Sequence, residues 1–251
     1  KVKNTETYIV MLQETMLIAP DVLKFMWRGQ YVFTPGAGNA RGCITLCPND
    51  CSISNIQHVS DRGHIFKVRL NQTTKTSVVV NLYAPTTKSE EKTIFFHDIE
   101  SKTLDSRDID EDLIIAGDFN TPLNPSEVYK RSFDKIAKKQ AEALKQVLHR
   151  LDLKDAWDMN KTSHTWTARG ASSRLDRICY SIESLKLTDI SIDWGLRKSD
   201  HAAVVCQFEK KEPRPRSKRN LIPYLNTYLL TNPEHLNTIK SEVENKMRQV
   251  P

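Results

Sequence analysis

The sequence predicts an α/β protein in which two sheets pack face to face and helices lie outside them. Two observations support this class: short apolar runs typical of strands dominate the first 208 residues, and only two segments there have a clear helical pattern. The strands outnumber the helices too heavily for regular βαβ units, which disfavours a doubly wound parallel sheet. A length of 251 residues and a hydrophobic content of 39% suffice for a folded core.

Six segments read as strands. Compact apolar runs flanked by polar or turn residues predict buried strands at Tyr8–Leu12, Cys43–Leu46, Val78–Leu82 and Leu113–Ala116. Ile65–Leu70 and Ile190–Trp194 instead alternate in polarity. We expect these last two strands to place one face on a core and the other toward solvent.

Two segments read as helices. Ser89–Leu104 begins with two glutamates, where the helix dipole favours negative charge, and we expect one side to carry Ile94, Phe95, Ile99 and Leu104. Phe133–Leu151 has a stronger amphipathic pattern, with apolar residues at spacings of three and four. They are Phe133, Ile136, Ala137, Ala141, Leu144, Val147, Leu148 and Leu151.

The composition changes after residue 208. Residues 209–220 form a basic linker, since Glu209–Arg219 holds six basic and two acidic residues and so +4 of the formal +6 charge. Residues 1–208 are thus nearly neutral as a body, which permits a polyanionic partner without requiring one. Residues 221–251 resume a helical pattern that is too short for a separate domain.

The five cysteines favour a reducing compartment, because their number is odd and no paired motif is present. Cys43, Cys47 and Cys51 recur at intervals of four, as in some zinc sites, but they lie in an apolar stretch and are better explained as buried small hydrophobes. No apolar run is long enough to span a bilayer, and no secretory signal is visible.

Five short segments place polar or ionisable side chains at the end of an apolar run. Such strand ends are where loops hold functional groups on a rigid scaffold. A single aspartate there is more often a cap or turn former, so only the whole set carries weight. The segments are Leu12–Thr15, Asn81–Pro85, Gly117–Thr121, Arg174–Ile178 and Ser199–Ala202.

This set contains the groups that phosphodiester hydrolysis needs around a metal and a water. Carboxylate oxygens of Glu14 and Asp200 suit Mg²⁺, or Mn²⁺ in its place, which would neutralise phosphate charge and stabilise the departing oxygen. Asp118 can align or deprotonate the attacking water, and the amide of Asn120 can hold that water or a phosphate oxygen.

Three further residues of the set can act on the phosphate. His201 can donate a hydrogen bond to the non-bridging oxygens where negative charge develops, with Asp176 setting its tautomer. Tyr83 adds a phenolic donor.

In this order, the motifs Leu-Gln-Glu-Thr at 12–15, Gly-Asp-Phe-Asn at 117–120 and Ser-Asp-His at 199–201 resemble the endonuclease/exonuclease/phosphatase superfamily, which includes apurinic endonucleases. The resemblance covers roughly residues 6–208. It implies a four-layer α/β sandwich, with two central mixed sheets flanked by helices. It also assigns the metal carboxylate, the water-orienting pair and the catalytic Asp-His pair to the three motifs.

Further motifs look like those of LINE-type (non-LTR) retrotransposon endonucleases: Arg41–Ile44, Asn81–Pro85, Gly117–Pro122 and His164–Trp166. Tyr224–Leu230 and the residues after it resemble the connector that leads toward reverse transcriptase in such polyproteins. The resemblance implies nicking of one DNA strand to leave a 3′-hydroxyl that primes reverse transcription. It also implies double-stranded DNA, the element RNA and the reverse transcriptase domain as partners. We expect a monomer that reaches the nucleus through the cytoplasm.

Several residues are expected to contact DNA. Thr165 and Ser199 stand where the family supports the phosphate and the Asp-His pair, although a turn-stabilising hydroxyl explains both equally well. Cationic side chains that can contact phosphates are Arg174 and Arg177, with Arg169 and Lys198 beside them, against the alternative of solvated surface charge.

The sequence departs from the family at its first strand, which normally carries an Asn-containing motif upstream of the Glu14 segment and is missing here. Without that strand and ligand, we expect weak or absent nicking by this fragment. The alternatives are an apurinic-site repair endonuclease, an inositol-phosphate phosphatase or sphingomyelin-type hydrolase, and a degenerate remnant that binds nucleic acid without turnover.

Overall fold

The computed structural model describes residues 8–70, 75–87, 90–108, 110–157, 163–181, 185–196 and 199–210. Contacts within the chain divide it into Lys1–Glu212 and Pro213–Pro251, and every described residue belongs to the first unit. The predicted connector at 221–251 and most of the predicted linker at 209–220 lie outside the described residues. The last strand continues to Lys210, so the first two residues of that linker belong to a sheet.

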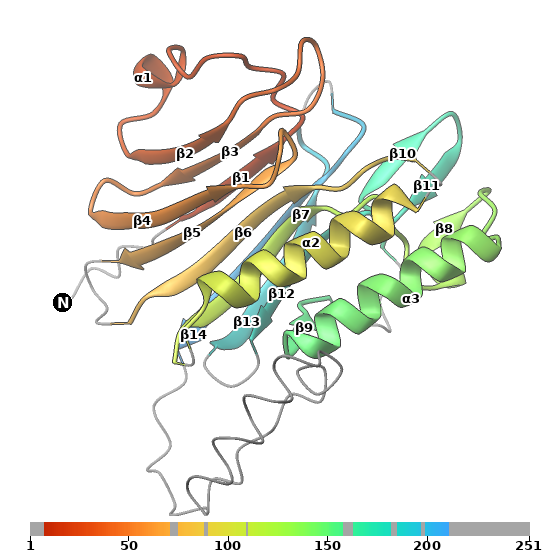
Figure 1. Ribbon diagram of the computed structural model, residues 1–251. Helices are drawn as coiled ribbons and strands as arrows, with labels where there is room; N and C mark the ends of the chain where they lie inside the picture. Colours follow the sequence, from red (N-terminus) through yellow and green to blue (C-terminus); the bar gives the residue numbers. More distant parts are fainter. Residues whose placement is uncertain are drawn as a thin grey trace, which may run out of the picture. The chain divides into compact units, whose positions relative to one another are not determined.

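A six-stranded mixed sheet forms the centre of this unit (Figure 1), and its only parallel neighbours in the described residues are β6 and β7. The strand order is β4 (Cys51–His58), β5 (Gly63–Leu70), β6 (Ser77–Tyr83), β7 (Asp112–Asp118), β12 (Asp176–Ser181) and β9 (Leu153–Asp155). The buried strands expected at Val78–Leu82 and Leu113–Ala116 are confirmed as the middle of β6 and β7.

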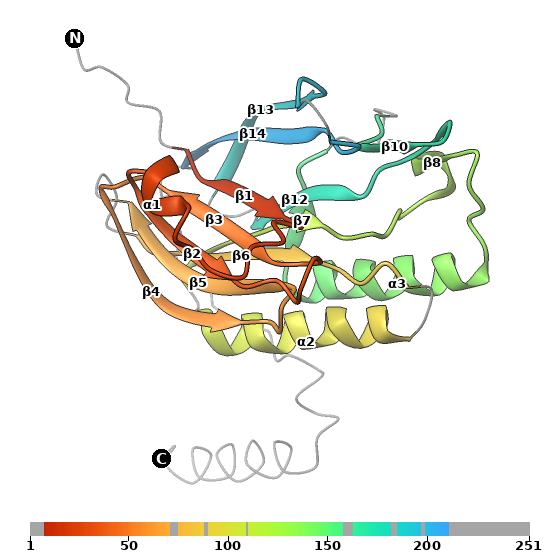
Figure 2. The same cartoon turned by 90° about the horizontal axis from the view of Figure 1, so that it is seen from above.

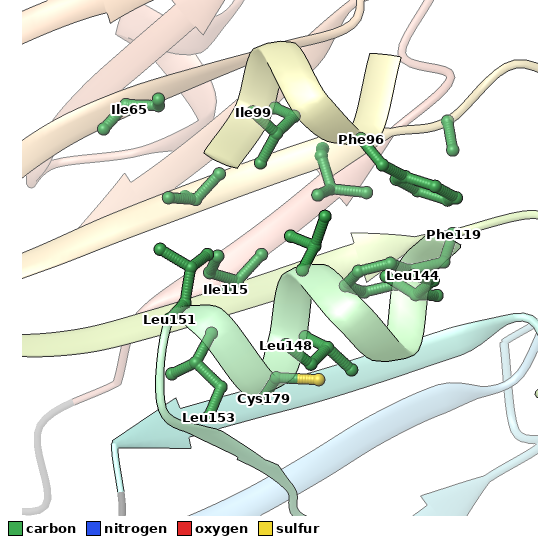
Figure 3. Packing of buried hydrophobic residues seen from close by; sticks show 14 of the residues in the cluster. Ile65, Phe96, Ile99, Ile115, Phe119, Leu144, Leu148, Leu151, Leu153 and Cys179 are labelled. Carbon is green, nitrogen blue, oxygen red and sulfur yellow. The ribbon is translucent and has the colours of Figure 1, made fainter. Parts of the chain in front are cut away.

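Two helices, α2 (Glu91–Ser106) and α3 (Lys135–Arg150), cover one face of the central sheet (Figure 2). Their apolar stripes pack on β5, β6 and β7 in one core, where Phe96 and Leu144 are each 1% exposed (Figure 3). Ile94 and Leu104 do not belong to this core, contrary to the prediction, and are 66% and 46% exposed. The face of α2 that meets the sheet passes instead through Phe95, Phe96 and Ile99.

Two smaller sheets cover the opposite face of the central sheet (Figure 2). One has the order β1 (Val10–Gln13), β3 (Cys43–Cys47), β2 (Gln30–Thr34), and the other pairs β13 (Leu185–Asp193) with β14 (Ala203–Lys210). Ile65 packs toward the helices and Phe66 toward the β1–β3–β2 sheet, and both are fully buried. The expected solvent-facing side of Ile65–Leu70 is therefore wrong for the first half of β5.

The remaining elements lie around this α/β sandwich. A third small sheet has the order β10 (Trp166–Ala168), β11 (Ala171–Ser173), β8 (Val128–Tyr129). Its strand β8 comes directly after the 3₁₀ helix η1 (Pro125–Glu127) in the chain. The short helix α1 spans Leu23–Met26. All five cysteines are free thiols, and Cys206 alone among them is not buried. Among the described helices, none is both long and apolar enough to cross a membrane.

Candidate active site

Three polar residues lie in one row across the central sheet. Tyr83 at the end of β6 pairs with Asp118 at the end of β7, and Asp118 pairs with Asp176 at the start of β12. Residues paired across neighbouring strands project to the same face, with Cβ atoms about 5 Å apart. The motifs that the sequence singles out on three separate strands are therefore brought together at one end of the sheet.

Asp118 is the most buried carboxylate of this row, at 5% exposure. Its two oxygens accept hydrogen bonds from the backbone N–H and the side-chain amide of Asn120, at 2.8 and 3.0 Å. Burial, followed by the charge of Asp176, raises the pKa of Asp118 to about 7. A carboxyl group with a pKa near neutrality is suited to exchange a proton with water.

Asp176 and His201 form a hydrogen-bonded pair, with 2.9 Å between Asp176 Oδ2 and His201 Nδ1. The segment before β14 brings His201 there. His201 forms an isolated antiparallel β-bridge with Trp166, and the backbone N–H of Ala202 donates to the Thr165 carbonyl. Burial lowers the pKa of His201, but the hydrogen bond to Asp176 and three nearby carboxylates outweigh it and raise the pKa to about 9. The imidazole is therefore protonated at neutral pH and is a donor.

Glu14 reaches the row from the other layer, directly after β1. Its carboxylate accepts a short hydrogen bond from the Tyr83 hydroxyl. Burial and this hydrogen bond raise the pKa of Tyr83, so the phenol stays protonated. The buried Arg62 lies over the Tyr83 ring, 5.5 Å from its centroid. Sequence reasoning missed Arg62, because it stands in a turn and belongs to no recognisable motif.

The carboxylates of this site fit a divalent cation. Ligand atoms of Asp118, Asp176 and His201 lie within 4.8 Å of one another. A protonated His201 cannot be a ligand, but the crowding of Asp118 by Asp176 and by Glu14 is what a cation would relieve. Glu14 is exposed, and within the described part of the chain its second carboxylate oxygen accepts no hydrogen bond.

The predicted metal ligand Asp200 lies outside this three-residue cluster. It is exposed, and its Oδ2 accepts a hydrogen bond of 2.9 Å from the Trp166 indole. The Arg131 guanidinium lies over that indole, 4.8 Å from the ring centroid. Ser199 is exposed too, and its hydroxyl accepts a hydrogen bond of 3.0 Å from the backbone N–H of His201.

Arg174 and Arg177 lie in the interior, which corrects the prediction that they contact phosphates. They are 4% and 1% exposed. Each forms ion pairs with both Glu127 and Asp155, for example 3.0 Å from Arg174 to Glu127 and 2.7 Å from Arg177 to Asp155. Two arginines and two carboxylates balance their charges, so the group can be buried. It ties β12 to the segment that follows Asn120.

Thr165 is also interior, at 1% exposure, which overturns its predicted contact with DNA. Its hydroxyl accepts hydrogen bonds from the N–H groups of Leu175 and Asp176, each at 3.0 Å, so it stabilises the start of β12. Another interior cation, Lys92 of α2, donates to the Asn120 carbonyl at 2.7 Å. Nothing in the helical pattern of α2 singles out Lys92.

The fold is similar to those of known proteins. An AP endonuclease from Archaeoglobus fulgidus shares the fold over 80% of this chain and 88% of its own, with a TM-score of 0.64 and 18% identity. A 3′ phosphatase from Neisseria, NExo, shares it over 82% and 90%, with a TM-score of 0.61 and 17% identity. The transposon TX1 uncharacterized 149 kDa protein of Xenopus laevis is 27% identical over 186 residues, which are 71% of this chain but only 14% of that protein. The profile of the Endonuclease/Exonuclease/phosphatase family matches residues 2–201, and the chain belongs to that family.

Proposed function

We propose that this chain is a metal-dependent endonuclease that nicks one strand of double-stranded DNA and leaves a 3′-hydroxyl that primes reverse transcription. The observation that carries the proposal is the meeting of Glu14, Tyr83 and Asp118 with the Asp176–His201 pair. This combines a proton acceptor, a cationic donor and exposed carboxylate oxygens around one point.

Each group has a part in hydrolysis. Asp118, oriented by Asn120, takes the proton of the attacking water. The imidazolium of His201, held by Asp176, donates to a non-bridging phosphate oxygen. Glu14 and Asp200 would supply oxygen ligands to Mg²⁺ or Mn²⁺, although Asp200 Oδ2 accepts a hydrogen bond from Trp166 in this structure. When bound, the cation neutralises phosphate charge and stabilises the departing oxygen.

A cationic surface beside the site supports nucleic acid as the substrate. Residues 128–133 and 163–173, which form the β8–β11–β10 sheet and its flanks, contain Lys130, Arg131 and Arg169 and no carboxylate. All three cations are exposed, and Arg131 is linked to Asp200 through Trp166. With Ser199, they are the proposed phosphate contacts. Lys198 lies outside the described residues.

The transposon relative supports a mobile-element setting, and the chain spans 14% of that protein. In this proposal the domain acts as a monomer in the nucleus, together with the element RNA and a reverse transcriptase domain.

The test is relaxation of supercoiled plasmid by the purified chain with Mg²⁺. We expect nicked circles whose formation, even if slow, is stopped by EDTA and lost in Asp118→Asn, while the exposed control Asp50→Asn behaves as wild type. Nicking that persists in Asp118→Asn would refute the assigned chemistry.

The same preparation separates the alternatives. Cleavage of abasic duplex alone would indicate a repair endonuclease. Salt-dependent DNA binding without metal-dependent turnover would indicate a degenerate remnant.

A further inference from the structure

The neighbouring residues Gln13 and Glu14 both reach the same strand of the central sheet. Gln13 Nε2 donates to Asn81 Oδ1 at 2.6 Å, and the Glu14 carboxylate accepts from Tyr83 two residues further along β6. Adjacent side chains of a continuous strand point to opposite faces. If β1 continued, Glu14 would point away from β6, as the 41% exposed Leu12 does.

A left-handed backbone at Glu14, with φ of 51°, resolves this conflict. It ends β1 and turns the carboxylate back toward β6. Such a conformation is uncommon for glutamate and persists only where surrounding contacts hold it. In the described residues, β1 has four residues and is paired on one edge only, by β3. Beyond Glu14, the backbone N–H groups of Thr15 and Met16 donate to the carbonyls of Gly42 and Arg41 at 3.2 and 2.9 Å.

Asn81 holds the backbone and side chain on the other side of Glu14, at Leu12 and Gln13. It is fully buried, and its Nδ2 donates to the Ile44 carbonyl at 3.0 Å, the Thr45 hydroxyl at 3.1 Å and the Leu12 carbonyl at 3.3 Å. Two of these partners are carbonyl groups and accept only, so the amide cannot be reversed, and Oδ1 must face Gln13.

We propose that the Gln13–Asn81 hydrogen bond is the positioning device of this site: it anchors the end of β1 so that the left-handed turn at Glu14 delivers the carboxylate to Tyr83 and to the metal. Neither Gln13 nor Asn81 reacts. The inference rests on the proposed function only in giving Glu14 a cation to bind.

The first test is metal-free and uses hydrogen exchange of the Met16 amide, which donates to the Arg41 carbonyl at 2.9 Å just after the turn. In Gln13→Met, which keeps the side-chain length, we expect Met16 to exchange roughly five to ten times faster, the effect of one lost hydrogen bond, while Val79 in the central sheet is unchanged. Gln57→Met on the exposed part of β4 is the matched control and should alter neither amide. Unchanged exchange at Met16, or equal acceleration at Val79, would overturn the proposal.

The second test is Mn²⁺ affinity without DNA, measured by water proton relaxation. Gln13→Met should weaken binding by roughly fivefold, and Asn81→Leu by at least as much, because it also removes the hydrogen bonds of Asn81 to Ile44, Thr45 and Leu12. The double variant should bind no more weakly than Asn81→Leu alone, because both substitutions remove the Gln13–Asn81 bond. Additive effects, or unchanged affinity in a folded Gln13→Met, would contradict the positioning role. If the wild type binds no Mn²⁺ the proposed function fails, whereas the exchange result still decides whether Gln13 holds the turn.

Discussion

Single residues of the site adopt states that are unfavourable in isolation. Glu14 and Asn120 have left-handed backbones, with φ of 51° and 46°. Asp118 is a buried carboxylate close to a second carboxylate. Such features are usual where function requires a particular geometry, and the rest of the fold compensates for their cost.

The raised pKa of Asp118 predicts that Asp118→Asn is more stable than the wild type at pH 8 without metal. Above the unfolded value of 3.8 the unfolded chain loses a proton that the folded chain keeps up to about pH 7, so this residue lowers stability as pH rises through that window. In urea unfolding, we expect the free energy of unfolding of Asp118→Asn to exceed that of the wild type by on the order of 1–3 kcal/mol at pH 8 and to differ little from it at pH 4. An equal difference at both pH values would mean that another property of Asp118 is responsible.

At the level of elements, the parallel contact between β6 and β7 places Tyr83 beside Asp118. Gly117 pairs with Leu82 on one side and Arg177 on the other, one position before Asp118. Its φ is 141°, and a Cβ there would overlap the Leu82 carbonyl. Close approach of the two strands therefore depends on glycine at this position.

Gly117→Ala should separate β6 from β7 and cost about 3 kcal/mol or more of unfolding free energy. Gly170→Ala is the matched control: φ is 76° there, but no atom lies within 4 Å of the added Cβ, so the cost should be about 1 kcal/mol. Denaturant unfolding of both variants measures the difference. Similar losses in the two variants would show that backbone strain, and not strand contact, is what matters at Gly117.

On the scale of the whole molecule, a buried polar group joins the central sheet to the β1–β3–β2 sheet. His64 of β5 is fully buried between the hydroxyls of Thr34 and Thr45, at 2.9 and 2.7 Å. Burial, with a smaller effect from His58, lowers the pKa of His64 to about 3. A neutral imidazole thus lies in the contact between the two sheets, beside their apolar core.

This predicts acid sensitivity of the fold. The unfolded chain protonates His64 below about pH 6.5 and the folded chain does not until about pH 3, so the contribution of His64 is present above pH 6.5 and is lost as pH falls. The stability difference between wild type and His64→Gln should shrink by about 2 kcal/mol from pH 7 to pH 5. The exposed His149→Gln should keep the wild-type pH dependence. A constant difference between wild type and His64→Gln would argue against a neutral buried His64.

Much of the architecture and the site was predictable because the signals are local. An apolar run followed by Gly-Asp-Phe-Asn marks a strand that ends in functional groups, and the position of Asp118 agrees with that. His201 instead precedes strand β14, and its place beside Asp176 depends on its pairing with Trp166. The exposure of a charged side chain is not local. Arg174 and Arg177 look like DNA contacts until Glu127 and Asp155, from other parts of the chain, are found to neutralise them.

The sequence by itself determined the class of fold, the order of the strands along the chain and the residue types available for hydrolysis, since periodicity and turn chemistry depend on near neighbours. Only the tertiary structure decided which of these residues meet. The row of Tyr83, Asp118 and Asp176 depends on strand register, and the turn of Glu14 toward it depends on a contact between residues 68 positions apart. Interactions between such distant positions are selected by packing of the whole domain, which no local pattern encodes.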